Sequence, residues 1–308
     1  MDRIIFLFTL ALAVAVVLQN AFTLWVTVAI KRKWKEKAED FMLPLEIFGY
    51  MIWLLCVLLI PRSLGTSALA TFTPKAEWWQ FLLAFFAQFA SVVLMILSAV
   101  IWSKLSGKEM ETGQEPDKNE VMSKTVRGLL SVLIFAPLAE EIVFRKILGQ
   151  YASGEGVMFF IILSAITFGL MHLPMLNFQV LIFTSWCGFI LSWVYLASGS
   201  FLLVFLFHAG SNLCLGVIPE NLPKKYEEVS QLLLMLLGVI ATIYIGFNLD
   251  LFIHQEDLAK SGSIFTKIFT NMGTYIFITA GVLSGIMFKR FIAKRKAEKE
   301  KEENAVQI

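Results

Sequence analysis

Three short motifs place polar or charged side chains inside stretches of the sequence that are otherwise apolar. Their members are Glu140, Glu141 and Arg145 in the first motif, Phe168 and His172 in the second, and His208 and Asn212 in the third. An ionisable side chain at the centre of a membrane-spanning helix costs at least about 2.5–3.5 kcal/mol, so such residues face a bundle interior or a wet cavity. We therefore expect the three motifs to meet at one polar site within a helix bundle.

In the first motif, two neighbouring carboxylates point in different directions from the helix. Glu141 and Arg145 are four residues apart with the acid first, which is the favourable order for an ion pair on a helix. Glu140 lies about 100° away round the helix and is free to face a cavity. Pro137 removes a backbone hydrogen bond before the acids and predicts a kink there. The alternative, a polar end of a short helix, is disfavoured because apolar residues lie on both sides.

The residue types in the motifs suit hydrolysis of a peptide bond by an activated water. A carboxylate beside an imidazole, such as Glu140 with His172, can hold and deprotonate a water. A second imidazole and an amide, His208 and Asn212, can donate hydrogen bonds to a developing oxyanion. No Gly-x-Ser-x-Gly is present, and Ser211 adjoins a histidine on its own helix, so a serine nucleophile is disfavoured. Taken singly, each histidine is better explained as an interfacial residue or as a contact between helices.

A metal site is the alternative use of the same side chains. Glu140, His172 and His208 could in principle bind zinc through one carboxylate and two imidazoles. The sequence has no His-Glu-x-x-His motif, and Asn212 is better explained as an oxyanion donor. We therefore expect a site without a metal or other cofactor, with zinc as the alternative.

The elements that must position these motifs are membrane-spanning helices. The chain has 308 residues, of which 57% are apolar and only 16% charged, against about 25% charged in ordinary soluble domains. This composition excludes a disordered chain and a nucleic-acid-binding domain. The three cysteines, Cys56, Cys187 and Cys214, lie within apolar runs, which argues against a small disulfide scaffold.

Nine apolar runs have about the length that crosses a bilayer. They cover residues 4–30, 41–60, 78–102, 128–148, 156–172, 177–197, 201–218, 230–248 and 274–292. The first run is too long for a signal peptide and predicts a retained helix. The predicted fold class is therefore all-α, a polytopic transmembrane helix bundle of about eight or nine spans. Residues 1–124 and 219–308 supply helices on either side of a central catalytic core at residues 125–218.

The distribution of basic residues predicts the orientation of the bundle. With nine spans and an external N-terminus, 19 Lys and Arg residues fall on the cytoplasmic side and seven on the other. Loops rich in Lys and Arg stay in the cytoplasm. We therefore expect the N-terminus outside and the C-terminus in the cytoplasm.

The three motifs, in this order and on separate apolar segments, resemble those of the CPBP family. This family includes the type II CAAX prenyl endopeptidases and many bacterial relatives. The sequence Ala-Pro-Leu-Ala before Glu140, and Phe144 before Arg145, are also similar to the family's first motif. The resemblance covers roughly residues 125–218 and implies the activity of an intramembrane endopeptidase.

The resemblance also implies roles for the motif residues. Glu140 would be the general base that activates water, His172 would help to hold it, His208 and Asn212 would form the oxyanion hole, and Glu141, Arg145 and Phe168 would support the site. The implied substrate is a peptide or membrane protein, lipidated or membrane-inserted, cut near its C-terminus or in its membrane-proximal part. The implied location is the cell membrane of a bacterium or archaeon, with the lipid bilayer as a partner and no nucleic acid.

Two further classes of function compete with the enzyme. A non-catalytic binding protein of the same fold, such as a bacteriocin immunity protein or a regulatory scaffold, would not need all of the polar groups at once. A secondary transporter with Glu140 as a proton relay predicts inverted repeats, and none is visible in the sequence. We therefore place the endopeptidase first, the binding protein second and the transporter last.

Overall fold

The computed structural model describes residues 1–33, 42–60, 76–107, 126–259 and 261–306. These residues form helices and short connections, and no strand occurs among them. The prediction of an all-α fold is therefore confirmed. The boundary expected at residue 124 lies outside the described residues.

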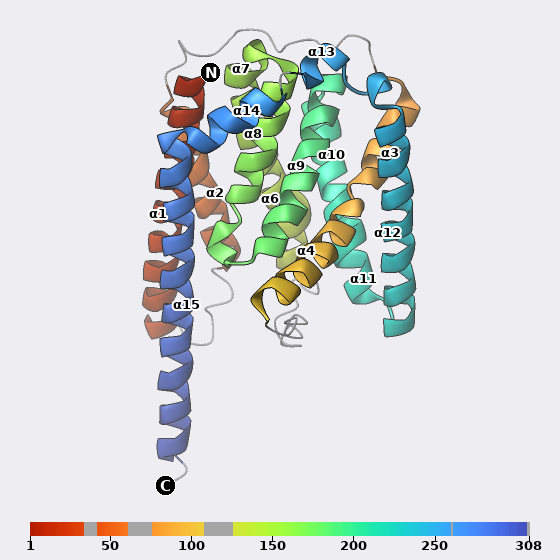
Figure 1. Ribbon diagram of the computed structural model, residues 1–308. Helices are drawn as coiled ribbons and strands as arrows, with labels where there is room; N and C mark the ends of the chain where they lie inside the picture. The colour runs from red at the N-terminus through yellow and green to blue at the C-terminus, as the bar shows by residue number, and fades with distance from the viewer. Residues whose placement is uncertain (34–41, 61–75, 108–125, 260, 307–308) are drawn as a thin grey trace.

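The helices form a bundle in which segments far apart in the sequence lie side by side, such as the first and the last helix (Figure 1). The regular helices are α1 (Asp2–Lys33), α2 (Met42–Leu58), α3 (Trp78–Ala87), α4 (Ala90–Ser106), α8 (Val157–Leu170), α9 (Phe178–Ser198), α10 (Phe201–Asn212), α11 (Ile218–Asn221), α12 (Lys224–Phe247), α13 (Gln255–Leu258), α14 (Ser261–Thr270) and α15 (Met272–Val306). Between α4 and α8, a single irregular helix consists of α5 (Val126–Leu130), a π-helical turn (Ser131–Phe135), α6 (Ala136–Glu141), a second π-helical stretch (Ile142–Ile147) and α7 (Leu148–Ala152).

Seven helices in the described part of the chain are long and apolar enough to cross a membrane. The sequence predicts eight or nine spans, and the two that fall short of this measure are also helical. One is α2, with 17 residues. The other is the irregular helix from α5 to α7, which carries the charged first motif and is therefore less apolar.

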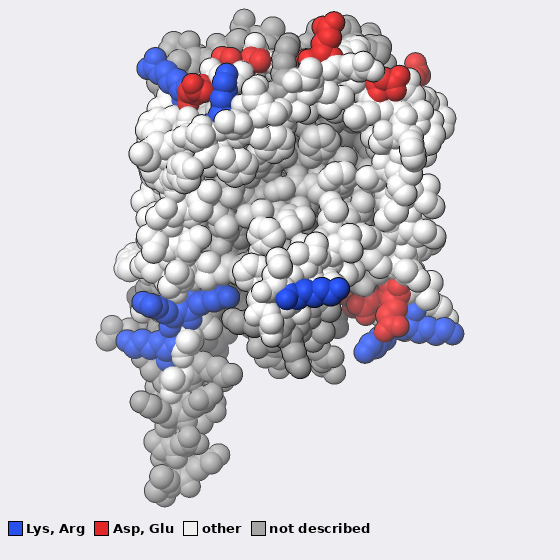
Figure 2. All heavy atoms as spheres, in the orientation of Figure 1, with Lys and Arg blue, Asp and Glu red and all other residues white. Residues whose placement is uncertain are grey.

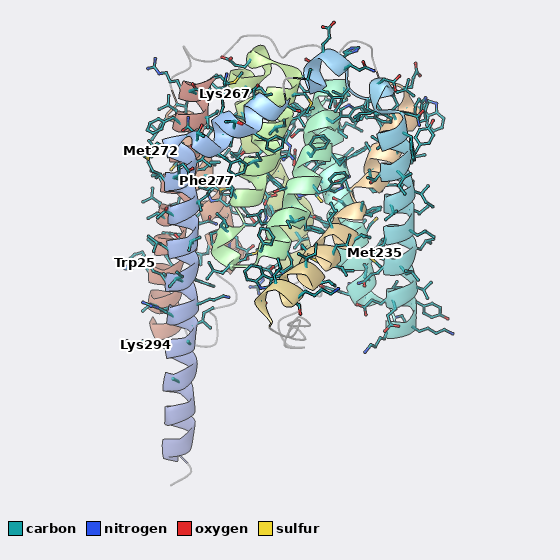
Figure 3. All side chains as sticks on the ribbon, in the orientation of Figure 1. Trp25, Met235, Lys267, Met272, Phe277 and Lys294 are labelled. Carbon is teal, nitrogen blue, oxygen red and sulfur yellow. The ribbon has the colours of Figure 1, made fainter. Side chains whose placement is uncertain are left out.

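Charged side chains are distributed as a bilayer requires. Figure 2 shows them gathered at the two ends of the bundle, with a belt of uncharged atoms between. Lys267 on α14 and Lys294 on α15 mark these two ends in Figure 3. The chain termini lie toward opposite ends (Figure 1). Together with the seven apolar helices, this arrangement indicates an integral membrane protein.

Helix α8 forms the centre of the bundle, because 12 of its residues are buried. It packs closely on α9 at Gly169, where an added Cβ would lie only 1.9 Å from the Ser185 hydroxyl oxygen. Helices α1 and α15 lie side by side, and Gly273 brings α15 against the α1 backbone at Phe6. Small residues allow such close contacts between helices in a membrane, where packing rather than hydrophobicity drives association.

Candidate active site

The first and third motifs each lie beside a π-helical turn that is followed by a proline. In the first, the N–H of Ala136 reaches back five residues to the carbonyl of Ser131, directly before Pro137. Directly after α10, the π-helical turn Leu213–Val217 is followed in the same way by Pro219. A proline ring clashes with the carbonyl four residues earlier, and a wider turn relieves the clash. At Pro137, where the sequence predicts a kink, the structure has this wider turn, a form that is frequent at functional sites.

The ion pair expected from the spacing of Glu141 and Arg145 is present and fully buried. Nη1 of Arg145 lies 3.0 Å from Oε1 of Glu141, and neither side chain is exposed. Nη2 of Arg145 donates to the carbonyl of Gly188 on α9, at 3.1 Å. The same Glu141 oxygen lies 2.7 Å from Nδ1 of His208. One carboxylate thus joins the first motif to the third.

The Phe168 ring occupies the centre of the three motifs. The guanidinium carbon of Arg145 lies 4.8 Å from its centroid, a cation–π distance. The rings of His172 and His208 meet it edge to face, with centroids 5.4 and 5.9 Å away. Phe144 packs on it in the same manner at 5.2 Å. Phe168 therefore fixes the relative positions of both imidazoles and the guanidinium.

His172 lies just beyond the end of α8 rather than inside a helix. The sequence predicts a span to residue 172, whereas α8 ends at Leu170 because Pro174 cannot continue a helix. Nδ1 of His172 lies 3.0 Å from the carbonyl oxygen of Phe168. A carbonyl only accepts, so Nδ1 carries the hydrogen and Nε2 of the neutral ring is left as an acceptor.

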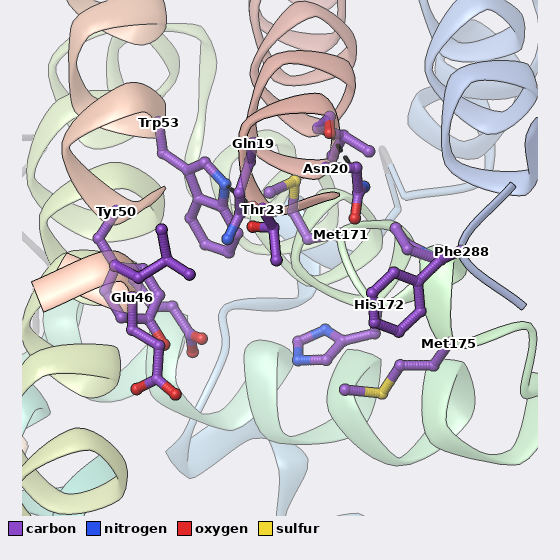
Figure 4. A pocket seen from close by; sticks show the side chains of 14 residues that line it. Gln19, Asn20, Thr23, Glu46, Tyr50, Trp53, Met171, His172, Met175 and Phe288 are labelled. Carbon is purple, nitrogen blue, oxygen red and sulfur yellow. Dashed lines mark hydrogen bonds between the residues drawn. The ribbon is translucent and has the colours of Figure 1, made fainter. Parts of the chain in front are cut away.

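Glu140 and His172 line one cavity of about 350 Å³, and Figure 4 shows this cavity with His172 labelled. Its walls come from α1, α2, α6, α15 and the turn after α8. The Glu140 side chain is 12% exposed, and its Oε2 lies 3.6 Å from Nε2 of His208. Glu140 thus has the cavity on one side and the second imidazole on the other, while Glu141 points into the protein.

Asn212 lies one turn beyond His208 on α10. Its Nδ2 donates to the carbonyl of Val132, at 2.9 Å, which occupies one of the two amide hydrogens. The second hydrogen and Oδ1 are not used in this bond. His208 and Asn212 are not among the residues that line the cavity. The structure therefore brings Glu140, His172 and His208 together, with Asn212 following on the helix of His208.

A zinc site at Glu140, His172 and His208 is the alternative use of these side chains. Among the described residues, no three or more His, Cys, Asp or Glu side chains lie close enough to bind one metal ion jointly.

The sequence reasoning missed the part of the site that α2 contributes. Glu46 and Tyr50 line the cavity beside Glu140. The Ser131 hydroxyl donates to Oε2 of Glu46. The sequence does contain an indication of this part of the site. Glu46 is an ionisable residue inside an apolar run, which is the same feature that marks Glu140 as a candidate.

One of three comparisons with known proteins found a match. A search of the curated proteins found no match, and neither did a search of the solved structures. One family model matches, and its description is type II CAAX prenyl endopeptidase Rce1-like. The matched segment includes all seven motif residues and ends just after Asn212. The resemblance is therefore confirmed for the central part of the chain, where residues 123–214 match the Rce1-like family of type II CAAX prenyl endopeptidases.

Proposed function

We propose that this protein is an intramembrane endopeptidase that hydrolyses a peptide bond with an activated water. The family match supports protease chemistry in a membrane. The observation that carries the proposal is the position of Glu140, which shares a cavity with His172 and lies 3.6 Å from His208. A carboxylate between two imidazoles, at the edge of a cavity, is suited to general acid–base chemistry.

Glu140 acts first as the base. It takes one proton from a water in the cavity, and Nε2 of His172 accepts a hydrogen bond from the remaining O–H of that water and so orients it. The resulting hydroxide attacks the carbonyl carbon of the scissile bond. Glu140 then gives its proton to the leaving nitrogen, so the carboxylate is regenerated when the carbon–nitrogen bond breaks.

His208 and Asn212 stabilise the oxyanion that forms on the attacked carbonyl oxygen. Since Nδ1 of His208 donates a hydrogen bond to the carboxylate of Glu141, Nε2 of the neutral ring carries no hydrogen and donates only when the ring is protonated. The free amide hydrogen of Asn212 supplies the second donor. Arg145 and Phe168 hold Glu141 and the imidazoles in place, and no metal or other cofactor takes part.

The substrate is a peptide or membrane protein that reaches the cavity from the bilayer, with or without a lipid. Helix α15 ends in a Lys-rich segment, and Figure 2 shows basic side chains at that end of the bundle. Basic residues favour the cytoplasmic side, which supports a cytoplasmic C-terminus and an external N-terminus. The cell membrane of a bacterium or archaeon is the proposed location.

The test is cleavage by the purified protein in phospholipid bicelles. The substrates are fluorescence-quenched peptides, each made with and without a farnesylated cysteine, and mass spectrometry locates the cut. Glu140→Ala should lower the rate by about 10²–10⁴-fold, which is the usual contribution of a general base. Glu256→Ala, which changes an exposed acid on α13, is the control and should cleave normally.

A non-catalytic binding protein predicts a different result. Such a protein would cut none of the peptides, and Glu140→Ala would keep the cellular phenotype of the parent gene. That pair of outcomes would overturn the endopeptidase and favour an immunity or regulatory role.

A further inference from the structure

The wall of the cavity opposite the catalytic motifs comes from helices outside the family match. Only residues 123–214 match the family model, yet α1, α2 and α15 all reach the cavity. Helix α1 contributes Gln19, Asn20 and Thr23. Substrate contacts on this side are therefore a property of this chain's own helices.

The polar residues of α1 interrupt a long apolar run at membrane depth. Thr23 follows Gln19 by four residues and Asn20 by three, so all three side chains share one helix face. Figure 4 shows them directed toward the space between Glu46 and His172. Polar residues in a spanning helix are costly unless they face a cavity or a partner, and here they face the cavity.

Part of their hydrogen-bonding capacity is unused. Nδ2 of Asn20 donates to the carbonyl of Val16, one turn earlier, at 3.0 Å. Oε1 of Gln19 accepts from the indole of Trp53. Within the described part of the chain, no hydrogen bond engages Oδ1 of Asn20, Nε2 of Gln19 or the hydroxyl of Thr23. The cavity therefore offers an acceptor, a donor and a hydroxyl that can do both.

A peptide that is to be cut inside a membrane needs such groups. Hydrolysis requires an extended segment, because the backbone groups of a helix are already paired with each other. Each backbone N–H or C=O left unpaired in apolar surroundings costs several kcal/mol. Neutral amides and hydroxyls can replace the lost pairing without adding charge. A lipid chain alone would have no use for them.

We infer that Gln19, Asn20 and Thr23 form the backbone-binding wall of the site and pair with an extended peptide segment beside the scissile bond. The inference rests on the proposed function and adds the residues that position its substrate. The apolar lining from Leu45, Met175 and Phe288 then receives the side chains of that segment. These α1 residues are positioning residues and take no part in bond breaking.

The experiment measures peptide binding separately from cleavage. The probe is a ten-residue peptide of Leu, Val and Ala with an N-terminal fluorophore, and its anisotropy is followed with detergent-solubilised protein. All proteins carry Glu140→Ala, so the probe stays intact. Adding Asn20→Leu and Thr23→Val should raise Kd about tenfold through the loss of about two hydrogen bonds. Asn248→Leu is the matched control, because Asn248 makes the same bond to a carbonyl one turn earlier, at 2.9 Å, away from the cavity.

A second set of probes tests the backbone contact without any change to α1. Each probe carries one N-methylated amide, which removes one backbone donor. At one or two positions, methylation should weaken binding to the protein with an intact α1 by about fivefold or more, and the penalty should shrink when Asn20 and Thr23 are replaced. No binding of the parent probe, no position sensitive to methylation, or a penalty unchanged by the α1 substitutions would each overturn the inference. If the inference fails in one of these ways but the protein without substitutions still cleaves peptides, the proposed function stands. If the probe binds as expected but the protein without substitutions cleaves no peptide, the proposed function is overturned and the peptide-binding role of α1 stands.

Discussion

Nδ1 of His208 lies 2.7 Å from Oε1 of Glu141, and this contact joins residues that are 67 positions apart. The same oxygen forms the ion pair with Nη1 of Arg145, at 3.0 Å. Because the acceptor is a carboxylate, the contact determines which imidazole nitrogen carries its hydrogen. Glu141 therefore aims the other nitrogen of His208 at Glu140, although it does not itself face the cavity.

Replacing Glu141 should destabilise the protein as well as inactivate it. In Glu141→Gln, Arg145 stays buried without a counter-charge, which typically costs about 3–5 kcal/mol. Thermal unfolding in detergent, followed by tryptophan fluorescence, should show a clear loss of stability. The double variant Glu141→Gln/Arg145→Met should recover much of it, because no isolated charge remains, but cleavage should stay low. A single variant as stable as the parent protein would contradict the buried ion pair.

Asn212 should contribute to the transition state rather than to substrate binding. Removal of one oxyanion donor usually lowers kcat by about 10²–10³-fold, so we expect this loss in Asn212→Ala with little change in KM. The bond to Val132 is lost as well. Asn221→Ala is therefore the control, because Asn221 also donates to a helix carbonyl, Val217, at 2.7 Å. Equal kcat values for the two variants would remove Asn212 from the proposed mechanism.

Local features of the site could be predicted from the sequence. The spacing of Glu141 and Arg145 is enough to predict their ion pair, because both lie on one helix. Apolar runs of bilayer length likewise predict the helices. Pro174 indicates that His172 lies outside α8. The four-residue spacing between Phe168 and His172 suggests a continuous helix instead.

Contacts between helices could not be predicted in this way. The bond between His208 and Glu141 depends on how α10 packs against α6, and a single sequence carries no information on pairs of distant residues. The same holds for the cavity, whose walls combine α1, α2 and α15 with the motif helices. Glu46 could be recognised as unusual, but its position beside Glu140 follows only from the packing of α2.

Cleavage should survive removal of divalent metal ions. The described Glu140, His172 and His208 side chains are not grouped as metal ligands would be, and the proposed steps use only their proton-transfer chemistry. Protein treated with EDTA or 1,10-phenanthroline should keep its kcat, and mass spectrometry of the elements should find far less than one zinc per chain. The opposite result would be one zinc per chain, with turnover lost when the zinc is removed and restored when it is added back. That result would show that these three residues are zinc ligands instead.

Gly285 on α15 should affect His172 through the loop that follows it. An added Cβ would lie 2.5 Å from the carbonyl oxygen of Pro174 and 2.7 Å from Cγ of Leu176, and Leu176 already has a φ of 52°, which few side chains adopt. The loop must therefore shift in Gly285→Ala. Since a displacement of about 1 Å can cost about 100-fold in rate, kcat should fall by tenfold or more. Gly246→Ala, whose Cβ meets nothing within 4 Å, should keep full activity. Equal kcat values at matched unfolding temperatures would mean that α15 does not position His172.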